Sequence, residues 1–441
     1  MNDVSSKRAR RAWYLYDAGN SAYAAVVLLA IYATYFQENV VVNDLSMGSF
    51  LWGIAITTAT AIVAVLSPIL GTIADVSGRK KLFLFRLTAM SCLFTASLFF
   101  VTPGAVALGM TLLILAEVGY RGSQVFYNSL LPDIASEQEM GRVSGNGWAI
   151  GSAGGVVCLL IVLAAVMAIG GALVTRLAMV FTAVYFALFT IPLFRHVQEK
   201  GERKPLPTGM GLVKLPFQRL AQTFRAARQY REFGKFLLAF LLYNEGILIT
   251  LSYGAILGKT LFGLQTEGII VFMIVVQLAS IPGAFVPGLV IGRIGVRNTL
   301  LISLTGLLAG VVWLFFAESV IAFYVIGAIA GFCLTGVQSV SRGTVGMLAP
   351  AGRSAEFYGF FALAGRTSSA VGPAIFGSIV LFATNALKRS GQLESDAVMA
   401  AHRFALFTII AFLVVGGVLL LRVTGKAGRG TESKLAMSDA E

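Results

Sequence analysis

The stretch GTIADVSGRKK, residues Gly71–Lys81, decides the fold class of this chain. It ends one apolar segment, Leu51–Ile73, and begins another, Leu82–Val101, each long enough to cross a bilayer as a helix. The carboxylate of Asp75 and the basic run Arg79–Lys81 are costly to bury in hydrocarbon, so the turn lies at a membrane surface. Because basic residues gather in short cytoplasmic loops, this surface is predicted to face the cytoplasm.

The composition of the whole chain also indicates a membrane protein. Its 441 residues are 57% hydrophobic and 12% charged, and the apolar residues come in blocks of about 20, the length of a transmembrane helix. Long blocks without alternating polarity favour helices over a β-barrel. The net charge of +13 could suggest a nucleic-acid partner. However, the basic residues lie between the apolar blocks, where they set membrane topology, so no nucleic-acid partner is expected.

The sequence carries no signature of an enzyme, a metal site or a disulfide framework. The three cysteines, Cys92, Cys158 and Cys333, all lie inside apolar segments and lack metal-ligand spacing. The patterns GxxxxGK[ST], HExxH and GxSxG are absent. We therefore expect no enzyme activity, no metal and no cofactor, with protons as the candidate coupling ion. The N-terminus shows no removable signal peptide, so the first span is expected to direct its own insertion.

Twelve membrane-spanning helices are predicted, which makes the fold class an all-α membrane protein. The spans are Trp13–Phe36, Phe50–Ile73, Leu82–Val101, Val106–Tyr127, Asn146–Ala168, Arg176–Phe194, Phe236–Leu257, Ile269–Val290, Thr299–Ala317, Ile321–Ser341, Tyr358–Phe382 and Phe404–Leu421.

The distribution of basic residues predicts the orientation. Of the 34 lysines and arginines, 26 fall on one side, in the termini, the loops and the exit of the loop before the third span, if the N-terminus is cytoplasmic. Three more, Arg121, Arg342 and Arg366, are assigned to spans. The opposite side holds five, which are Arg176, Lys259, Lys388, Arg389 and Arg403. This asymmetry predicts that both termini are cytoplasmic.

The chain divides into two similar halves, residues 1–194 and 236–441, joined by a cytoplasmic linker, 195–235. LYDAG (Leu15–Gly19) near the start of the first half matches LYNEG (Leu242–Gly246) in the second, and GTIADVSGRK matches GLVIGRIGVR (Gly288–Arg297). Two such halves of six spans are typical of transporters that bind substrate between the halves, near mid-bilayer. The linker contains a basic amphipathic stretch, FQRLAQTFRAARQYREF, read either as a membrane-surface helix or as a solvated tether.

Polar residues inside the first-half spans are candidates for a substrate path. Asp17, Asn20 and Tyr23 lie on the first span, where Asp17 could instead be exposed or cap a helix N-terminus. The fourth span carries a stripe of polar residues, spaced four, three and four positions apart. They are Glu117, Arg121, Gln124 and Asn128. Such a stripe faces away from lipid, although Glu117 and Arg121 could simply neutralise each other.

The second half holds a buried acidic candidate near the middle of the seventh span. Asn244 and Glu245 have no cation beside them in the sequence, so Glu245 could bind a proton or a substrate amine, with Arg121 as its cross-cavity partner. The alternative is a structural hydrogen bond to another helix. The remaining polar candidates in spans are Gln277, Gln338, Arg342 and Arg366, of which Arg342 could instead end its helix at the surface.

The loop Gly71–Lys81 resembles the loop between the second and third helices of the major facilitator superfamily, with the pattern GxxxDxxGRK. The resemblance implies a conformational latch formed by Gly71, Asp75, Gly78, Arg79 and Lys80. In that latch Asp75 pairs with a basic residue and with a helix N-terminus. This chain has Val76 where the general motif often carries a basic residue, which weakens the charge network of the motif but leaves Asp75 and Arg79 able to latch the helices.

Four further stretches resemble the vacuole effluxer branch of this superfamily. They are AWYLYDAGNSAY (Ala12–Tyr23), FYNSLLPDIASEQEMGRVSGNGWAIG (Phe126–Gly151), FLLYNEGI (Phe240–Ile247) and the region Gly336–Pro373. The fungal members of that branch are linked to autophagy and to amino-acid release from the vacuole.

The sequence thus predicts a monomeric secondary transporter of a small solute, such as an amino acid, working by alternating access in the inner membrane of a prokaryote. An exporter or flippase of lipophilic compounds or lysolipids is one alternative. A non-transporting membrane receptor or assembly partner is the other, and a large extra soluble domain, which would favour it, is not seen in the sequence.

Overall fold

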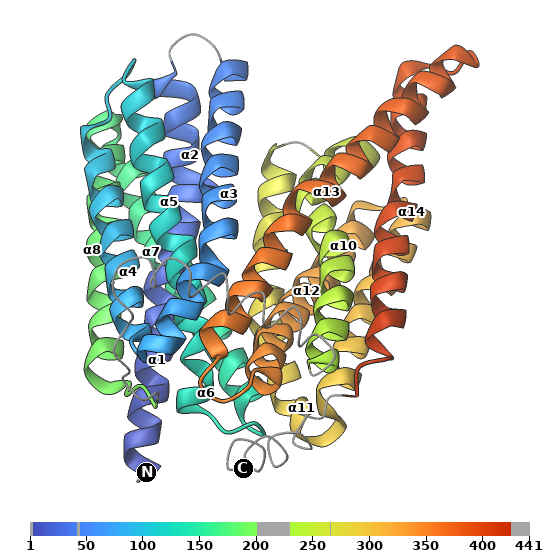
Figure 1. Ribbon diagram of the computed structural model, residues 1–441. Coiled ribbons are helices and arrows are strands. Elements are labelled where there is room, and N and C mark those ends of the chain that lie inside the picture. Colours follow the sequence, from blue (N-terminus) through green and yellow to red (C-terminus); the bar gives the residue numbers. More distant parts are fainter. Residues whose placement is uncertain (1–2, 42–44, 201–229, 265, 425–441) are drawn as a thin grey trace. The chain divides into compact units, whose positions relative to one another are not determined.

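The computed structural model describes the chain apart from residues 1–2, 42–44, 201–229, 265 and 425–441 (Figure 1). Throughout this described part the chain forms helices and turns, with no strand. Most of the predicted amphipathic stretch in the linker lies outside the described residues.

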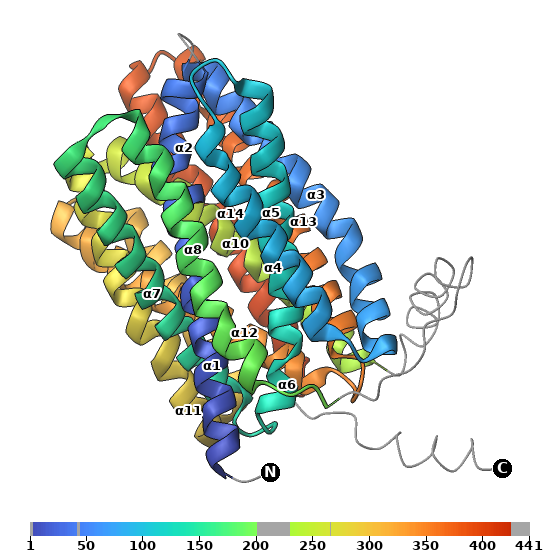
Figure 2. The ribbon, with the colours of Figure 1, turned by 90° about the vertical axis from the view of Figure 1, so that its left-hand side faces the viewer.

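The first span is a composite helix. It consists of α1 (Asp3–Tyr23), the π-helical segment η1 (Ala24–Ala30), α2 (Ile31–Tyr35) and a second π-helical segment, η2 (Phe36–Val40). The next elements are α3 (Leu45–Ser77), α4 (Lys80–Ser97), the short 3-10 turn η3 (Leu98–Phe100), α5 (Val106–Ser129), α6 (Leu131–Ile134), α7 (Met140–Ile169) and α8 (Gly171–His196). Helices α4 and α5 pack against each other, as do α1, α7 and α8 (Figure 2).

The remaining helices carry the last six spans. They are α10 (Arg231–Phe262), α11 (Thr266–Phe316), α12 (Val320–Leu348), α13 (Ser354–Arg389) and α14 (Glu394–Leu420). Helix α11 contains two predicted spans, because the backbone leaves helical geometry at Gly295 (φ 79°, ψ 165°) without opening a loop. The sequence had predicted a longer connection there.

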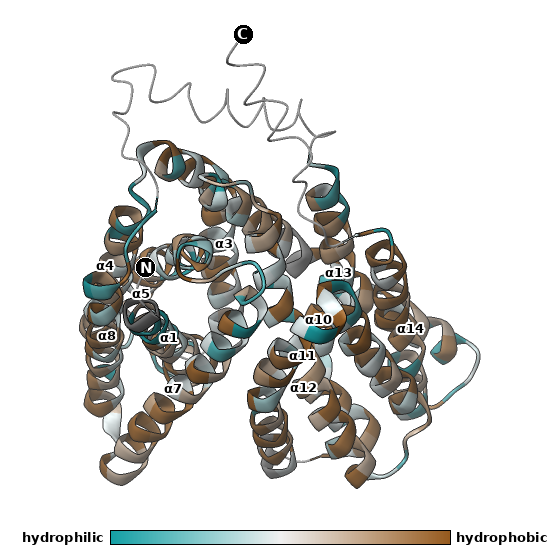
Figure 3. Cartoon of the chain, turned by 90° about the horizontal axis from the view of Figure 1, so that it is seen from below, coloured by the Kyte–Doolittle hydropathy of each residue, from teal (hydrophilic) through white to brown (hydrophobic). Residues whose placement is uncertain are grey.

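The number of spans agrees with the prediction. Eleven helices of the described part are long and apolar enough to cross a membrane, and hydrophobic residues cover most of their length (Figure 3). One of them, Val271–Phe316, has 46 residues, about twice the length that a bilayer requires. Since this helix is broken at Gly295, it accounts for two of the twelve predicted spans.

The turn between α3 and α4 and its counterpart in the second half both contain a glycine with a positive φ. Gly78 (φ 61°) separates α3 from α4, and Gly295 (φ 79°) separates the two spans of α11. A positive φ is strained for residues with a Cβ, so glycine is required at both positions. The matched sequences GTIADVSGRK and GLVIGRIGVR therefore each place a glycine of positive φ between two spans, as an internal duplication predicts.

The matched motifs LYDAG and LYNEG also have the same packing role. A Cβ at Gly19 on α1 would lie 2.9 Å from the Cβ of Phe189 on α8. A Cβ at Gly246 on α10 would lie 3.0 Å from the Cγ of Leu413 on α14. Each glycine thus lets the first helix of its half approach the last helix of that half closely.

Contacts divide the chain into two compact units. The first consists of Met1–Gln222 and Ala349–Leu363, and the second of Thr223–Leu348 and Ala364–Glu441. The loop before α13 and the first turns of that helix therefore pack with the first unit, although they follow the tenth span in the sequence. The predicted domain limits at residues 194 and 235 stay a prediction.

Candidate functional site

Asp75 binds the N-terminus of α13. Its carboxylate accepts hydrogen bonds from the backbone N–H groups of Ala355 (3.1 Å) and Glu356 (2.7 Å). The first N–H groups of a helix have no partner within the helix and carry a partial positive charge, so a carboxylate is favourable there. The Asp75 side chain is only 1% exposed. Both contacts lie within the first unit, because it includes residues 349–363.

Lys80 is the basic residue that joins this contact. Its ammonium lies 3.7 Å from the carboxylates of both Asp75 and Asp133, and it donates a hydrogen bond to Ser354 Oγ at 2.6 Å. Arg79, the other basic residue predicted to belong to the latch, is exposed. Helix α4 begins at Lys80, with Arg79 as its N-cap in non-helical geometry, so the two side chains leave the backbone in different directions.

We call the buried set Asp75, Lys80, Asp133, Ser354 and Glu356 the Asp75 cluster. Ser354 extends it by donating a hydrogen bond to the carbonyl of Ser129, and Glu356 is held by Arg353 through two hydrogen bonds of 2.9 Å. The cluster thus connects α3, α4, the α5–α6 region and α13. Asp133 was not among the predicted site residues, although its position after Pro132, just past the fourth span, is a usable signal.

Two glycines bring α3 and α13 into backbone contact beside the Asp75 cluster. A Cβ at Gly71 would lie 2.5 Å from the carbonyl oxygen of Ala355, and a Cβ at Gly359 would lie 2.8 Å from that of Ser67. Neither carbonyl can move without displacing its helix. The glycines therefore permit a close approach that any side chain would prevent.

A second group of predicted residues lies between α1 and α5, also in the first unit. Glu117 is fully buried and pairs with Arg121 on the next turn of α5, as the spacing of four allows. Tyr23 is fully buried, stacks on Tyr120 at 4.5 Å, and lies close enough to Glu117 to interact with it electrostatically. Asn20 is 3% exposed and lies one turn earlier on α1.

The other predicted residues of the first half have different surroundings. Asp17 is 7% exposed and lies against Gly151 of α7. Since α1 begins at Asp3, Asp17 lies in mid-helix and cannot cap the N-terminus. Gln124 and Asn128 are half-buried and continue the stripe on α5.

The second unit brings together Asn244 and Gln338, whose side-chain amide donates a hydrogen bond of 2.8 Å to Asn244 Oδ1. Beside them, Glu245 is 2% exposed and accepts a hydrogen bond of 2.5 Å from the backbone N–H of Gly372 on α13. A Cβ at Gly372 would lie 2.5 Å from the same carboxylate oxygen, so this glycine makes room for Glu245. This contact is the interhelical hydrogen bond that the sequence analysis had kept as an alternative.

The three remaining predicted residues are not part of this pair. Arg342 is 6% exposed, so it does not end α12 at the surface. Gln277 is exposed, on a face of α11 shared with the exposed side chains Met273 and Ile274. Arg366 lies within α13, but its side chain is outside the described residues.

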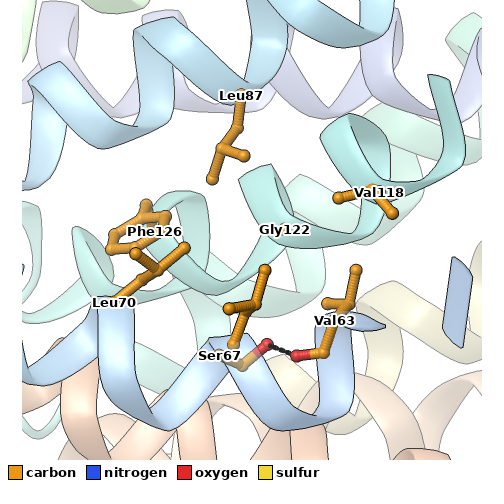
Figure 4. Close-up of a pocket in the computed structure, with 8 residues that line it drawn as sticks. Val63, Ser67, Leu70, Leu87, Val118, Gly122 and Phe126 are labelled. Atoms are coloured by element: carbon orange, nitrogen blue, oxygen red, sulfur yellow. Dashed lines mark hydrogen bonds between the residues drawn. The ribbon is translucent and has the colours of Figure 1, made fainter. Parts of the chain in front are cut away.

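Two pockets of the described chain have apolar linings. The one in Figure 4 has a volume of about 20 Å³ and lies between α3, α4 and α5, lined by Leu70, Leu87 and Phe126 among others. It holds one water molecule at most. A larger groove of about 460 Å³ runs between α10, α13 and α14, lined by Leu242, Ile375 and Phe404 among others. No group of three side chains suited to a metal ion occurs in the described part.

Comparison with known proteins agrees with this architecture. The model of the family described as "Vacuole effluxer Atg22 like" matches residues 39–432. An uncharacterized MFS-type transporter, YxiO of Bacillus subtilis, is 28% identical over 94% of each chain. Autophagy-related protein 22 of Yarrowia lipolytica is 26% identical over 54% of this chain, which spans 45% of that protein.

The fold has solved counterparts as well. The proton:xylose symporter XylE, of the major facilitator superfamily (MFS), superposes with a TM-score of 0.71 over 98% of this chain and 99% of its own, at 12% identity. At that identity the likeness concerns the fold alone. The relatives and structural neighbours of this chain are transporters and not enzymes. The chain therefore belongs to the vacuole effluxer Atg22-like family, and it is a multi-pass membrane transporter of the major facilitator superfamily.

Proposed function

We propose that this protein is a proton-coupled secondary transporter of a small zwitterion such as an amino acid, and that it works by alternating access. The observation that carries the proposal is the burial of Glu245 among apolar helices. Within the described part of the chain, its carboxylate accepts its hydrogen bond from a backbone N–H group, that of Gly372. No lysine or arginine forms an ion pair with it in the part of the chain that the structure describes. An ionised carboxylate without a cation is strongly disfavoured inside a membrane, so Glu245 is suited to hold a proton.

The first half supplies the polar groups for a zwitterion. Glu117 and Arg121 place an acid and a base one turn apart on α5, beside Asn20 and Tyr23 of α1. Opposite charges at this spacing fit the amino and carboxylate groups of an amino acid. The family description, vacuole effluxer, favours export as the direction.

The Asp75 cluster is proposed to act as the latch that stabilises one conformation of the transport cycle. It joins α3 and α4 to the first turns of α13, a helix whose later residues belong to the second unit. The proposed setting is the plasma membrane of a prokaryote, with both termini cytoplasmic and the protein acting as a monomer. The full-length similarity to a Bacillus subtilis protein supports this setting.

The test uses the purified protein in proteoliposomes. A thermal-shift screen against amino acids, peptides, nucleosides and lysolipids first identifies ligands, and radiolabelled uptake is then measured with and without a pH gradient. Glu245→Gln should abolish uphill transport while exchange of pre-loaded substrate survives. Glu318→Gln, the same change at an exposed carboxylate, is the control. Full pH-driven uphill transport by Glu245→Gln would exclude Glu245 as the coupling group.

A second candidate function is export of lipophilic compounds or lysolipids. The groove between α10, α13 and α14 favours it, because its lining is apolar and includes the exposed rings of Phe404 and Phe407. The lysolipid arm of the same screen separates the two candidates. Transport of a labelled lysolipid that amino acids do not inhibit would support this function.

A further inference from the structure

Several buried polar atoms of the first unit have no hydrogen-bond partner by geometry among the described residues, and three of them belong to the group between α1 and α5. They are Asn20 Oδ1, Tyr23 Oη and Glu117 Oε2. Their side chains belong to residues that are at most 3% exposed. Buried polar groups are nearly always hydrogen-bonded in folded proteins, and one left without a partner is destabilising. Three together mark a place where a ligand supplies the missing partners.

The three residues are neighbours because α1 and α5 run antiparallel at this point. Near one end of the contact, Trp13 stacks on Tyr127 at 4.3 Å and donates a hydrogen bond to its carbonyl. Further along, Tyr23 stacks on Tyr120. Asn20 is one turn from Tyr23 on α1, and Glu117 is one turn from Tyr120 on α5, so side chains with these spacings share a face.

The chemistry of these atoms selects a ligand with hydrogen-bond donors. An amide oxygen and a carboxylate oxygen only accept hydrogen bonds, and a tyrosine hydroxyl can also accept one. An ammonium group carries three donors and no acceptor, and it matches this set. The other oxygen of Glu117 accepts a hydrogen bond from Arg121. The Arg121 side chain is itself 26% exposed, so it can meet a carboxylate on the same ligand.

We propose that Asn20, Tyr23 and Glu117 form an ammonium-binding subsite that is complete within the first half. Under the function proposed above, on which this assignment to a substrate rests, the subsite takes the amino group of the zwitterion. Glu245 is then free to serve proton coupling alone. This division replaces the cross-cavity pairing of Glu245 with Arg121 that the sequence had suggested.

The test combines affinity with stability, measured on the full chain in lipid nanodiscs. The variants are Asn20→Leu, which removes an unpartnered oxygen, and Tyr23→Phe, which removes the hydroxyl that interacts with Glu117. Tyr35→Phe is the control, because that hydroxyl is already bonded to the carbonyl of Val101 at 3.0 Å. The probes are the amino acid that gives the largest shift in the screen, its N-acetyl derivative, and phenethylamine, which is measured whatever the screen gives.

Each variant should weaken binding of the amino acid and of phenethylamine by about 10- to 100-fold, as expected for a hydrogen bond to a charged group. Binding of the N-acetyl derivative, which lacks the ammonium, should not respond. Asn20→Leu should also raise the melting temperature of the free protein, because an unsatisfied buried group is removed. Tyr35→Phe should lower the melting temperature and leave affinity unchanged.

Two outcomes would overturn the subsite. One is unchanged affinity for both ammonium-bearing probes in Tyr23→Phe and Asn20→Leu, which would leave water as the occupant. The other is failure of both probes to bind the wild-type protein. If no amino acid binds but phenethylamine does, and the variants weaken it, the zwitterion proposal fails while the subsite stands.

Discussion

Replacing Asp75 by asparagine is expected to weaken the contact between α3 and the N-terminus of α13 while leaving the protein folded. The aspartate accepts two backbone hydrogen bonds and lies 3.7 Å from Lys80. Asparagine has nearly the same shape, but only one of its two terminal atoms accepts hydrogen bonds, and it carries no charge. Its NH2 group would face a backbone N–H, so at least one hydrogen bond is lost.

The magnitude follows from these contacts. A hydrogen bond to a charged group contributes about 1.5–3 kcal/mol. A carboxylate at a helix N-terminus adds about 0.3–1 kcal/mol. Together Asp75→Asn should weaken the contact by about 2–4 kcal/mol, which changes the equilibrium between latched and open states by about 30- to 1,000-fold.

The first assay is transport into proteoliposomes, normalised to the amount of protein in the membrane. The second is the alkylation rate of a single cysteine that replaces Ser136, next to the Asp75 cluster. Transport should fall by at least tenfold, and alkylation should accelerate. Arg79→Gln, the same loss of charge at an exposed position in the same turn, is the control and should have little effect. Wild-type transport and alkylation in Asp75→Asn, at normal membrane levels, would refute the latch.

Gly359→Ala should reduce transport and lower thermal stability, because its Cβ would lie 2.8 Å from a carbonyl oxygen of α3. The control is Gly53→Ala, whose Cβ would meet nothing within 4 Å and which should be neutral. Equal melting temperatures for the two variants would contradict the close approach of α3 and α13. The hydrogen bonds from Arg10 lower the pKa of Glu139 to about 2, so this pair should stabilise the protein by about 1 kcal/mol above pH 4.5 and progressively less as the pH falls toward 2. Melting curves of wild type and Glu139→Gln from pH 7 to pH 3 test this, and a gap that does not narrow at low pH argues against it. Single cysteines in the linker 195–235 should react with an impermeant reagent only after the membrane is opened, and labelling from outside intact cells would reverse the predicted orientation.

The spans were predictable from the sequence because burial in lipid requires long apolar blocks, which are visible without tertiary information. The i, i+4 pair of Glu117 and Arg121 was also visible, since it depends on helix geometry alone. The contact of Asp75 with a helix N-terminus could be anticipated only through the resemblance to a family.

Other features depend on tertiary structure and were not predictable. Lys80 and not Arg79 joins Asp75, because the first turn of α4 directs one side chain inward and the other outward. Glu245 meets Gly372 because two helices far apart in the sequence approach closely there. The π-helical segments after Tyr23 have no signature in composition or hydropathy.

The grouping of residues 349–363 with the first unit has a consequence for biosynthesis. Asp75, Lys80 and Asp133 are made early, but the backbone that covers Asp75 belongs to residues 355 and 356. At about 5–20 residues per second, roughly 10–60 s of translation separate the two. During that interval the nascent first half holds three charged side chains without their final cover. Folding of the first half is therefore completed only when the eleventh span arrives, and a chain that stalls before it should be recognised by membrane quality control.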